Sequence, residues 1–600
     1  MTKQILSGNE AVALGAWESG VKVASAYPGT PSTEILENFA RYEGVYAEWA
    51  PNEKVALEVL AGSSMAGVRT LATMKHVGLN VAADPLMTLA YTGVKGGALL
   101  VCADDPGMHS SQNEQDSRYY ARFAQIPMLE PSGSQEAKEM VAAALALSEE
   151  MDTPAMLRVT TRIAHGKGVV TTGDAPAAES GAGFEPDRPK YCMLPGFAKQ
   201  RHPLVLERVA KLKAFAEETD LNRIEWGNSG VGVIAAGISY QYVKEVLPDA
   251  SVFKLGLTFP LPEEKIKAFA AKVDRLMVVE ELEPYLEDEL SIMGLTVEGK
   301  AWFPRIDELN PERVAQGFRE AGVLQDEAPA PPEAIPGADM PRPPLMCAAC
   351  AHRGLFYALN KMKGIVHGDI GCYTLSALPP LTAIHSCLCM GAGISMAHGT
   401  AQAIAAAGGE NQQPVFGVIG DSTFFHSGIT SLLNVVYNQS DVTIIIMDNR
   451  ITAMTGGQQN PGTGHTLQKR EAPAVDILKL VQTLGVQQAR EVDPFNIKET
   501  LAALKEATAF KGPAVLVTRR PCVQLLERDA RLVRQVDPDA CIGCAMCLRL
   551  GCPAIAQGDE IPPEKEGKKI RKRALIDATL CRGCSLCEQV CKSKAIAQVS

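Results

Sequence analysis

The last part of the chain carries two cysteine runs with the spacing of iron–sulfur ligands. In the first run, cysteines at every third position are followed by a fourth that precedes a proline: Cys541, Cys544, Cys547 and Cys552. The second run repeats the pattern without that proline: Cys581, Cys584, Cys587 and Cys591. Thiolates at every third residue wrap a short loop around a [4Fe–4S] cluster. The runs therefore predict two clusters and the transfer of single electrons.

Oxygen ligands follow two predicted strands in the preceding region. Apolar runs at 414–419 and 442–447 predict buried strands, which end in Gly420-Asp421-Ser422 and Asp448-Asn449. Ligands bind at the carboxyl ends of the strands of open α/β sheets. Asp421 and Asn449 are therefore expected to converge on Mg²⁺, which prefers oxygen ligands and shares substrate phosphates. The alternative is an ordinary turn after the strand, capped by Asp421.

The segment between these strands has a helical period. In 428–438, the apolar residues Ile429, Leu432, Leu433 and Val436 are predicted to share one buried helix face.

Four further cysteines suggest a third cluster. Cys347 and Cys350 form a CxxC pair, Cys372 follows in Asp369-Ile370-Gly371-Cys372, and Cys522 stands far downstream. Four thiolates suit a [4Fe–4S] cubane. The alternative is a set of unrelated buried cysteines, since cysteine is among the most frequently buried residues.

Polar residues near the N-terminus have both structural and functional interpretations. Glu53 follows Asn52, which predicts an N-cap with an acid in the first helical turn. Thr30 precedes Pro31, which suits an N-cap followed by proline at the first helical position. His76 and His352 could line a pocket, but a single histidine is more often a structural residue.

Apolar runs alternate with helical periodicity through most of the chain, which predicts α/β layers. The 600 residues exceed a single core, so several domains are expected. We predict α/β domains at 1–185, 190–325 and 345–525, and a cysteine-rich module at 535–600. Seven prolines in 326–344 predict an extended linker, because proline interrupts helices and central strands.

Charge and hydropathy exclude some classes of function. A net charge of -11 argues against nucleic-acid binding, which needs a basic face. The apolar stretch 388–409 contains His398, Gln402 and several glycines, so we expect a tightly packed buried helix and not a membrane span. The start of the chain shows no secretory signal. Cysteines at metal-ligand spacing favour a reducing cytoplasm over a disulfide scaffold.

The order Gly-Asp-Ser, twenty-five residues, Asp-Asn resembles the thiamine diphosphate motif. The resemblance implies that Asp421, Asn449 and the backbone carbonyl of Ile451 hold Mg²⁺ against the diphosphate, with Gly420 and Ser422 at the turn. Ser422 stands where glycine is more common. Gly456, in Thr455-Gly456-Gly457-Gln458, belongs to a loop typical of the oxidative branch of these enzymes.

Taken with the cysteine runs, nearly the whole chain resembles the large (alpha) subunit of indolepyruvate ferredoxin oxidoreductase, in the thiamine-diphosphate-dependent 2-oxoacid:ferredoxin oxidoreductase family. The resemblance implies two doubly wound thiamine-binding domains: a pyrimidine-binding type at 1–185 and a diphosphate-binding type at 345–525. Between them lies an α/β domain like the transketolase C-terminal domain, at 190–325. The module at 535–600 is then an α+β, two-cluster, ferredoxin-like domain.

The resemblance also implies roles for individual residues. Glu53 would hydrogen-bond the aminopyrimidine of thiamine, and Thr30 would contact the substrate carbonyl region. Because the fourth cysteine of each run ligates the other cluster in two-cluster ferredoxins, two ligand sets follow: Cys541, Cys544, Cys547 and Cys591; Cys552, Cys581, Cys584 and Cys587. In related oxidoreductases, positions matching the other set bind a cluster near thiamine: Cys347, Cys350, Cys372 and Cys522.

The implied reaction is oxidative decarboxylation of an arylpyruvate, with electrons passing through the clusters to an external ferredoxin and coenzyme A taking the acyl group. Pyruvate-specific relatives hold the substrate carboxylate with an arginine near a segment that is acidic here, 103–106, so that clamp is not expected. A small beta subunit and a dimer of alpha-beta heterodimers are implied. The alternatives are an oxidoreductase for branched-chain or other 2-oxoacids, a non-oxidative thiamine decarboxylase or ligase, and an electron-carrier subunit with a degenerate thiamine fold.

Overall fold

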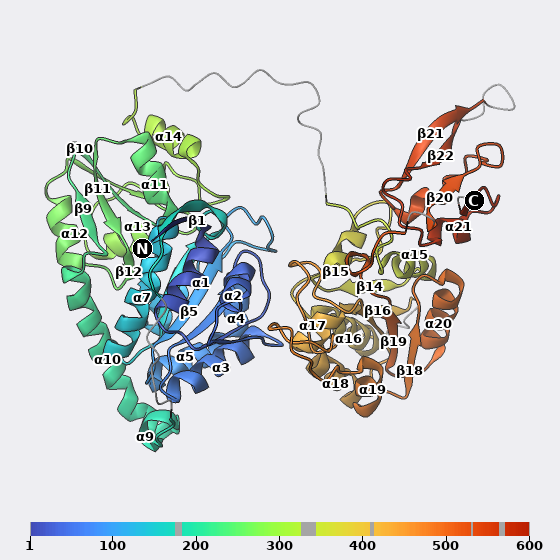
Figure 1. Ribbon diagram of the computed structural model, residues 1–600, viewed down its shortest axis with the longest axis horizontal. Coiled ribbons are helices and arrows are strands. Elements are labelled where there is room, and N and C mark those ends of the chain that lie inside the picture. The colour runs from blue at the N-terminus through green and yellow to red at the C-terminus, as the bar shows by residue number, and fades with distance from the viewer. Residues whose placement is uncertain are drawn as a thin grey trace. The chain divides into compact units, whose positions relative to one another are not determined.

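The computed structural model describes residues 2–174, 183–325, 344–408, 413–529, 532–562 and 570–598. Their contacts divide the chain into two compact units (Figure 1). Unit 1 comprises Met1–Glu333 and Leu467–Lys469, and unit 2 comprises Ala334–Thr466 and Arg470–Ser600. The predicted linker, 326–344, lies outside the described residues except for Pro344. The finer domain boundaries stay predictions.

A seven-stranded sheet forms the centre of the first part of unit 1. Its strands are β2 (Val23–Ala26), β3 (Tyr46–Trp49), β4 (Thr70–Lys75), β5 (Ala98–Asp104), β6 (Met128–Leu129), β7 (Ala155–Thr160) and β12 (Leu257–Phe259). The order is β12-β6-β7-β5-β4-β2-β3, and only β12 runs antiparallel to its neighbour. Strands β4, β5 and β7 are buried along their whole length, as parallel strands covered on both faces should be.

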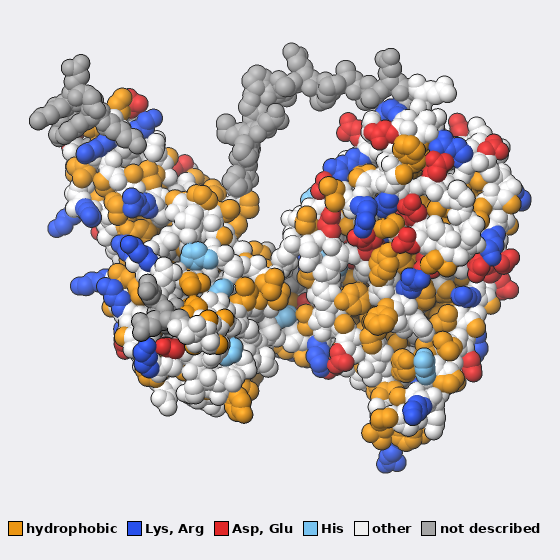
Figure 2. All heavy atoms as spheres, turned by 180° about the vertical axis from the view of Figure 1, so that it is seen from behind, with side chains coloured by type: hydrophobic (Ala, Val, Ile, Leu, Met, Phe, Trp, Pro, Cys, Tyr) orange, Lys and Arg blue, Asp and Glu red, His pale blue; other side chains and the backbone are white. Residues whose placement is uncertain are grey.

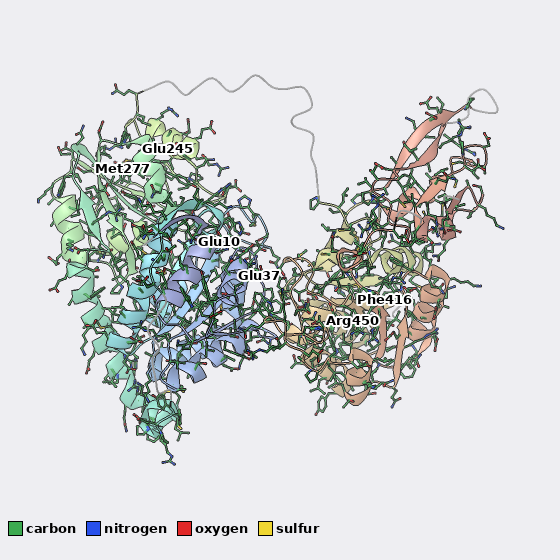
Figure 3. All side chains as sticks on the ribbon, viewed as in Figure 1. Glu10, Glu37, Glu245, Met277, Phe416 and Arg450 are labelled. Carbon is green, nitrogen blue, oxygen red and sulfur yellow. The ribbon has the colours of Figure 1, made fainter. Side chains whose placement is uncertain are left out.

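Helices cover this sheet, and its core divides into two apolar clusters. The helices are α1 (Gly8–Glu18), α2 (Thr33–Phe39), α3 (Glu53–Met65), α4 (His76–Val81), α5 (Ala83–Thr92), α6 (Arg118–Ala124), α7 (Ser134–Met151) and α8 (Thr161–His165). Ser7 and Glu10 form a capping box that starts α1 (Glu10 is labelled in Figure 3). An antiparallel pair, β1 (Lys3–Ser7) and β8 (Lys167–Thr171), lies outside the sheet.

The second part of unit 1 has its own four-stranded sheet, in the order β13-β10-β11-β9. Its elements are α9 (Arg188–Tyr191), α10 (Pro195–Glu218), β9 (Arg223–Glu225), β10 (Asn228–Ala236), α11 (Gly237–Val246), β11 (Ala250–Leu255), α12 (Glu263–Ala270), β13 (Arg275–Val279), α13 (Tyr285–Ile292) and α14 (Pro311–Glu320). Met277 lies in its core (Figure 3). Because β12 pairs with β6, this part completes the seven-stranded sheet of the first.

Unit 2 contains a six-stranded, fully parallel sheet in the order β15-β14-β16-β17-β19-β18. The strands are β14 (Ile365–Gly368), β15 (Ser386–Cys387), β16 (Val415–Gly420), β17 (Thr443–Asp448), β18 (Gln488–Val492) and β19 (Ala514–Arg519). Both strands predicted around the Gly-Asp-Ser and Asp-Asn motifs, β16 and β17, are confirmed. Phe416 of β16 is fully buried in this core (Figure 3).

The helices of unit 2 are α15 (Arg353–Met362), η1 (Cys372–Ala377), α16 (Ala392–Ala406), α17 (Asp421–Thr423), η2 (Phe424–Gly428), α18 (Ile429–Tyr437), α19 (Ile477–Thr483), α20 (Ile497–Ala509) and η3 (Val523–Leu525). The helix predicted at 428–438 is confirmed, but its predicted face is partly wrong: Leu433 is 51% exposed and Val435 is buried in its place. The five-residue π-helix η2 precedes α18 and changes the phase of its turns.

Helix α16 differs from its prediction in burial. A helix forms within 388–409 as expected, but it buries only Gly393, Ile394 and Ala397. Its remaining residues are partly or fully exposed in the single chain. The prediction of a tightly packed buried helix was therefore wrong for most of its length. No helix in the described ranges is long and apolar enough to cross a membrane.

The C-terminal part of unit 2 consists of two small antiparallel pairs, β20 with β23 and β21 with β22. Its elements are β20 (Arg534–Val536), η5 (Leu548–Leu550), β21 (Ile555–Ile561), β22 (Arg571–Ile576), α21 (Leu586–Val590) and β23 (Ile596–Gln598). An apolar cluster joins Leu550 and Leu586 to Tyr357 of α15 and Ile497 of α20.

On the face shown in Figure 2, acidic and basic side chains are interspersed over unit 1, without a uniformly basic surface.

Candidate active site

Two aspartates meet at the carboxyl edge of the sheet in unit 2. The last residue of β16, Gly420, pairs in register with Met447 of β17, so Asp421 and Asp448 follow neighbouring strand ends. Asp421 is 3% exposed and accepts a hydrogen bond from Asn460 Nδ2 at 3.2 Å. Burial raises the pKa of Asp421 to about 7, and the Asp448 carboxylate adds to the rise. A cation at this edge would relieve that cost.

Asn449 and Ile451 lie in the loop after β17, where Arg450 is labelled in Figure 3. The Asn449 side chain is buried, and its Oδ1 accepts the Ile451 N–H at 3.2 Å. Its Nδ2 lies 3.3 Å from Nε2 of His352. Burial lowers the pKa of His352 to about 4, so this imidazole is neutral at pH 7. The loop and β16 therefore offer a carboxylate, an amide oxygen and a backbone carbonyl, which are the donors that Mg²⁺ takes.

A buried tyrosine and aspartate support the turn after β16. The Tyr373 hydroxyl donates to Asp369 Oδ2 at 2.7 Å and accepts the Gly420 N–H at 2.9 Å. Gly391 N donates to Asp369 Oδ1 at 2.8 Å. A Cβ on Gly420 would lie 2.8 Å from the Tyr373 ring, so this position requires glycine. Burial raises the pKa of Asp369 to about 6.

The predicted Gly456 loop is a tight turn in the chain after β17. Gly456 and Gly457 have φ angles of +120° and +95°, which glycine tolerates best. Gln458 Nε2 donates to the Thr455 carbonyl at 2.8 Å, and the backbone of Gln458 pairs with Thr452. Thr452 in turn donates from Oγ1 to Ser422 Oγ at 2.8 Å. The loop is thus tied to the turn after β16.

The four scattered cysteines of the predicted third cluster come together. Burial raises the pKa of the Cys372 thiol to about 11, and the nearby Cys522 and Cys347 thiols add to the rise. Cys372 and Cys347 act in the same way on Cys350, whose pKa burial raises to about 12. Cys522 N donates to the Asn449 carbonyl at 2.9 Å. This thiol group therefore borders the Asp421–Asn449 edge.

The C-terminal cysteines fall into two further groups. Burial raises the pKa of Cys547 to about 11, with contributions from Cys544 and Cys591. Burial also raises the pKa of Cys587 to about 12, with contributions from its neighbours. One cavity is lined by four of these thiols: Cys552, Cys581, Cys584 and Cys587. Cys591 of the second run thus lies near Cys544 and Cys547 of the first run, and Cys552 of the first run lies with Cys581, Cys584 and Cys587 of the second.

Within the described residues, no three His, Cys, Asp or Glu side chains are arranged to hold a single metal ion. Four thiolates that bind a cubane stand around a group of eight atoms, with each sulfur on a different iron. The thiol groups above have the donors for such a cluster and not for an isolated ion.

Glu53 and Thr30 lie at the carboxyl edge of the seven-stranded sheet in unit 1. Asn52 caps α3 by accepting the Val55 N–H at 2.9 Å, as predicted. Glu53 is nonetheless only 4% exposed, which is unusual for a first-turn acid. A Cβ on Gly78 would lie 2.6 Å from Glu53 Oε1, so the glycine makes room for this carboxyl group.

Thr30 is not a helix cap. Helix α2 begins at Thr33 with Ser32 as its N-cap residue, so the N-cap interpretation of Thr30 was wrong. The Thr30 carbonyl accepts a hydrogen bond from Ser110 Oγ at 3.1 Å. His76 is 1% exposed and its Nε2 lies 3.2 Å from the Asn113 carbonyl.

Sequence reasoning missed Asn460, Tyr373 and the contact role of Asp369. Asp369 precedes a cysteine that was singled out, so its place in that motif was a usable signal. Asn460 and Tyr373 lie 39 and 47 residues from the groups they contact; Tyr373 directly follows the singled-out Cys372, whereas no local pattern marks Asn460.

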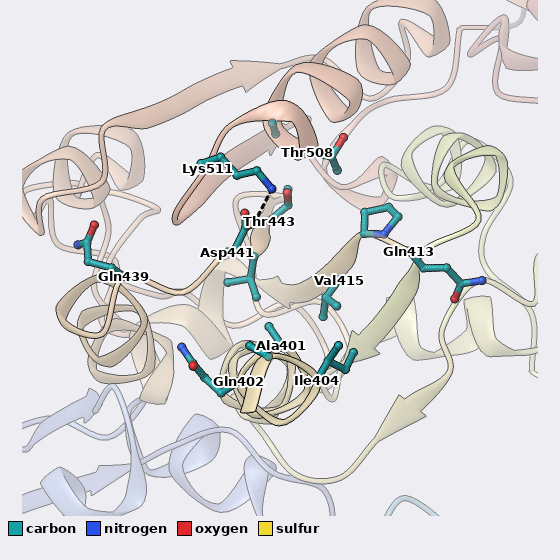
Figure 4. Close-up of a pocket in the computed structure, with 14 residues that line it drawn as sticks. Ala401, Gln402, Ile404, Gln413, Val415, Gln439, Asp441, Thr443, Thr508 and Lys511 are labelled. Carbon is teal, nitrogen blue, oxygen red and sulfur yellow. Dashed lines mark hydrogen bonds and ion pairs between the residues drawn. The ribbon is translucent and has the colours of Figure 1, made fainter. Parts of the chain in front are cut away.

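A hollow of about 780 Å³ lies away from these residues, at the amino ends of β16 and β17 (Figure 4). An ion pair between Lys511 and Asp441, 3.2 Å apart, crosses part of it. Ala401, Ile404 and Val415 supply apolar walls. Its lining contains neither the oxygen donors nor the thiols described above, so we do not assign the chemistry to it.

Comparison with known proteins finds two domain families in this chain. Residues 14–206 match the family "Pyruvate flavodoxin/ferredoxin oxidoreductase, thiamine diP-bdg", and residues 369–518 match "Thiamine pyrophosphate enzyme, C-terminal TPP binding domain". Among solved structures, a 2-oxoglutarate:ferredoxin oxidoreductase from Magnetococcus marinus matches 53% of this chain and 65% of its own, at 18% identity and a TM-score of 0.44.

Curated relatives match over the full length. Indolepyruvate oxidoreductase subunit IorA of Pyrococcus horikoshii is 39% identical over 648 residues, covering 100% of this chain and 97% of the relative. The same subunit of Pyrococcus abyssi is 40% identical over 641 residues, covering 99% and 97%. Identity of this extent includes both thiamine domains and the cysteine-rich C-terminal part. The chain belongs to the family of the indolepyruvate oxidoreductase subunit IorA.

Proposed function

We propose that this chain is the large subunit of an enzyme that oxidatively decarboxylates arylpyruvates of the indolepyruvate type. The acyl group leaves as an aryl-acetyl-coenzyme A thioester, and the electrons pass through [4Fe–4S] clusters to ferredoxin. The relatives' name supports the substrate class, and their designation as a subunit supports a second, small subunit. A dimer of such heterodimers and a reducing, cytoplasmic setting complete the proposal.

The thiamine diphosphate site would use donors from unit 2. Asp421, Asn449 and the Ile451 carbonyl would hold Mg²⁺ against the diphosphate, with Gly420, Ser422 and Gly456 bordering it. The bound cofactor accepts the electron pair that decarboxylation releases. The oxygen donors at the ends of β16 and β17, and the raised pKa of Asp421, support this assignment.

Glu53 would hydrogen-bond the aminopyrimidine, and Thr30 would contact the substrate carbonyl region. The burial of Glu53 at a helix N-terminus supports its role, because a hydrogen bond to a ligand is stronger where water is excluded. Both residues belong to the 1–185 domain that the family match overlaps.

Three clusters would conduct the electrons. The proposed ligand sets are Cys347, Cys350, Cys372 and Cys522; Cys552, Cys581, Cys584 and Cys587; Cys541, Cys544, Cys547 and Cys591. The last two sets would form a ferredoxin-like module at 535–600. The observation that carries the proposal is the hydrogen bond from Cys522 N to the Asn449 carbonyl. It sets a thiol group suited to one-electron chemistry beside donors suited to a magnesium diphosphate.

The reaction is tested anaerobically with the chain co-produced with its small subunit. Ferredoxin or viologen reduction is followed with coenzyme A and indolepyruvate, pyruvate or a branched-chain 2-oxoacid. We expect thiamine-dependent reduction that is fastest with indolepyruvate. Reduction with the other acids alone would overturn the substrate class. Fully loaded enzyme that reduces nothing would favour an electron-carrier subunit.

The third cluster is tested by iron analysis of the full chain. Three cubanes require about twelve irons per chain. The double variant Cys347→Ser/Cys522→Ser should retain about eight, because the C-terminal sets are intact. The exposed Cys192 belongs to none of these groups, so Cys192→Ser is the matched control. Equal iron in all three proteins would refute the third cluster.

A further inference from the structure

Lys75 is a buried cation without an ion-pair partner in the described part of unit 1. Its side chain is 8% exposed, and Nζ donates to the Ser110 carbonyl at 2.9 Å. An ammonium group has three N–H donors, so two remain for a ligand. The other buried cations of the described unit 1 each pair with a carboxylate: Arg118, Arg158, Arg208 and Lys254.

Lys75 ends β4, between the strand ends that carry Thr30 and Asp105. Ala26 of β2 pairs with Thr73 of β4, and Lys75 itself pairs with Ala103 of β5. The Ser110 residue that binds Lys75 also donates to the Thr30 carbonyl. This is the carboxyl edge of a parallel sheet, where ligands bind.

The neighbouring glycine leaves a passage for the lysine side chain. A Cβ on Gly29 would lie 3.3 Å from both Cγ and Cδ of Lys75, which is shorter than an ordinary van der Waals contact between two carbon atoms. The absence of a side chain at Gly29 therefore lets the lysine extend along the turn that contains Thr30.

The nearby acids do not neutralise Lys75 by direct contact. Asp105 accepts hydrogen bonds from Ser110 N at 2.8 Å, Ser111 Oγ at 2.7 Å and Thr161 Oγ1 at 2.8 Å. Asp105 and Glu53 still favour the charged lysine electrostatically, while burial lowers its pKa to about 8. Lys75 is thus mostly charged at neutral pH, in a place where an unpaired charge is costly.

We infer that Lys75 binds the carboxylate of the 2-oxoacid substrate and selects for it. The inference rests on the proposed function, and it fills a gap in the sequence analysis, which expected no arginine clamp at 103–106. Arg158 of β7, the neighbour of β5, is ion-paired with Asp104 and Glu130 at 2.6 and 2.5 Å, so its charge is already neutralised. The cation comes from β4 instead.

A binding measurement tests this without turnover. The probes are indole-3-propionate and its amide, which differ only in the carboxylate, titrated into the loaded full-length complex. A hydrogen bond to a charged group contributes more binding free energy than one to a neutral group, and the difference corresponds to about tenfold in affinity. We expect the unmodified protein to prefer the carboxylate by at least about tenfold, and Lys75→Met to lose that preference.

The control replaces a lysine outside this edge. Lys267 on α12 is 39% exposed, so Lys267→Met should keep the preference for the carboxylate. Lys75→Arg should keep part of it, which separates loss of charge from damage to the fold. Equal affinities for the two probes in the unmodified protein, or an unchanged preference in Lys75→Met, would overturn the inference.

Kinetics distinguish this inference from the proposed function. In Lys75→Met, KM for indolepyruvate should rise about tenfold or more, whereas the rate with indole-3-acetaldehyde, which has no carboxylate, should be unchanged. Equal losses with both compounds would overturn the role of Lys75. If the unmodified complex turns over no 2-oxoacid, the proposed function fails, and the binding preference still decides whether Lys75 is a carboxylate site.

Discussion

At the carboxyl edge of each large sheet lies a buried ionisable side chain without an ion-pair partner among the described residues: an acid in unit 2 and a base in unit 1. In unit 2, Asp421 has an amide partner and no cation among the described residues, and Asp448 raises its pKa further. Among the described residues of unit 1, Lys75 has one carbonyl partner and no carboxylate at ion-pair distance. The Asp421 carboxylate is complementary to a cation, and the Lys75 ammonium is complementary to an anion. In the proposals above, the first would hold the metal of a diphosphate and the second a substrate carboxylate.

The largest expected effect comes from removing the acid at the first edge. Asp421→Asn keeps the shape but replaces the carboxylate that we propose binds Mg²⁺, so affinity for thiamine diphosphate with Mg²⁺ should fall by about a hundredfold or more. Because a buried charge is removed, the melting temperature of the cofactor-free protein should not fall. Cofactor titration and thermal melting measure both. Asp441→Asn, in the hollow at the other end of the sheet, is the control, and equal behaviour of the two variants would contradict the assignment.

Glu53→Gln comes next. A positioned acid–base group contributes about 10²- to 10⁴-fold to rate, so turnover should fall by about a hundredfold while thiamine binding persists. Exchange of the thiazolium C2 proton, followed by NMR, should slow with it. Glu58 lies five residues further along α3 and its side chain is exposed, so Glu58→Gln should behave as the unmodified protein does. A slow exchange in both variants would point to a structural effect.

The proposed carboxylate site at Lys75 should lose affinity for the substrate at alkaline pH. Lys75 has its pKa lowered to about 8 by burial, although Asp105 and Glu53 oppose that shift. Below this pH the ammonium is charged and holds the carboxylate; above it the amine is neutral. KM for indolepyruvate should therefore be flat below pH 8 and rise about tenfold per pH unit above it. In Lys75→Met that rise should disappear, and a rise that persists would assign it to another group.

The smallest effect tests the space around Glu53. A Cβ in Gly78→Ala would meet Glu53 Oε1 at 2.6 Å. We expect a loss of about 1–3 kcal/mol in stability, or a displaced carboxyl group with a smaller fall in turnover than in Glu53→Gln. Gly62→Ala in α3, where a Cβ meets nothing within 4 Å, is the control for adding a methyl group. Identical unfolding and turnover in the two variants would show that Glu53 tolerates displacement.

The sequence was most informative where a local pattern determines structure. The apolar runs of β16 and β17 and the Asn52 cap of α3 were predicted from neighbouring residues, and the structure confirms them. The prediction for Leu433 was wrong because the buried face of α18 consists of Leu432, Val435 and Val436, an equally helical spacing that the predicted set of apolar residues did not follow. The prediction that α16 is buried was wrong for most of its length, because apolar composition alone does not determine which elements pack against a helix.

The site could be predicted only in its motif-bearing parts. Asp421 and Asn449 follow strands and are recognised by that position, whereas Tyr373 and Asn460 reach the site from segments with no such mark. The sequence analysis did not single out Lys75. Lys75 stands out because it has no carboxylate partner among the described residues. Which side chains form ion pairs is decided by the folded structure, so the sequence alone does not reveal it.

One backbone hydrogen bond links two components with different vulnerabilities. The Cys522 N–H and the Asn449 carbonyl join the loop that would hold an oxygen-sensitive cluster to the loop that would hold a metal. Damage to the first loop by air would loosen the second, so cofactor should be released before the fold is lost. During purification, the amount of thiamine retained should then fall as exposure to oxygen increases. Adding thiamine alone should not restore the activity of an enzyme handled in air.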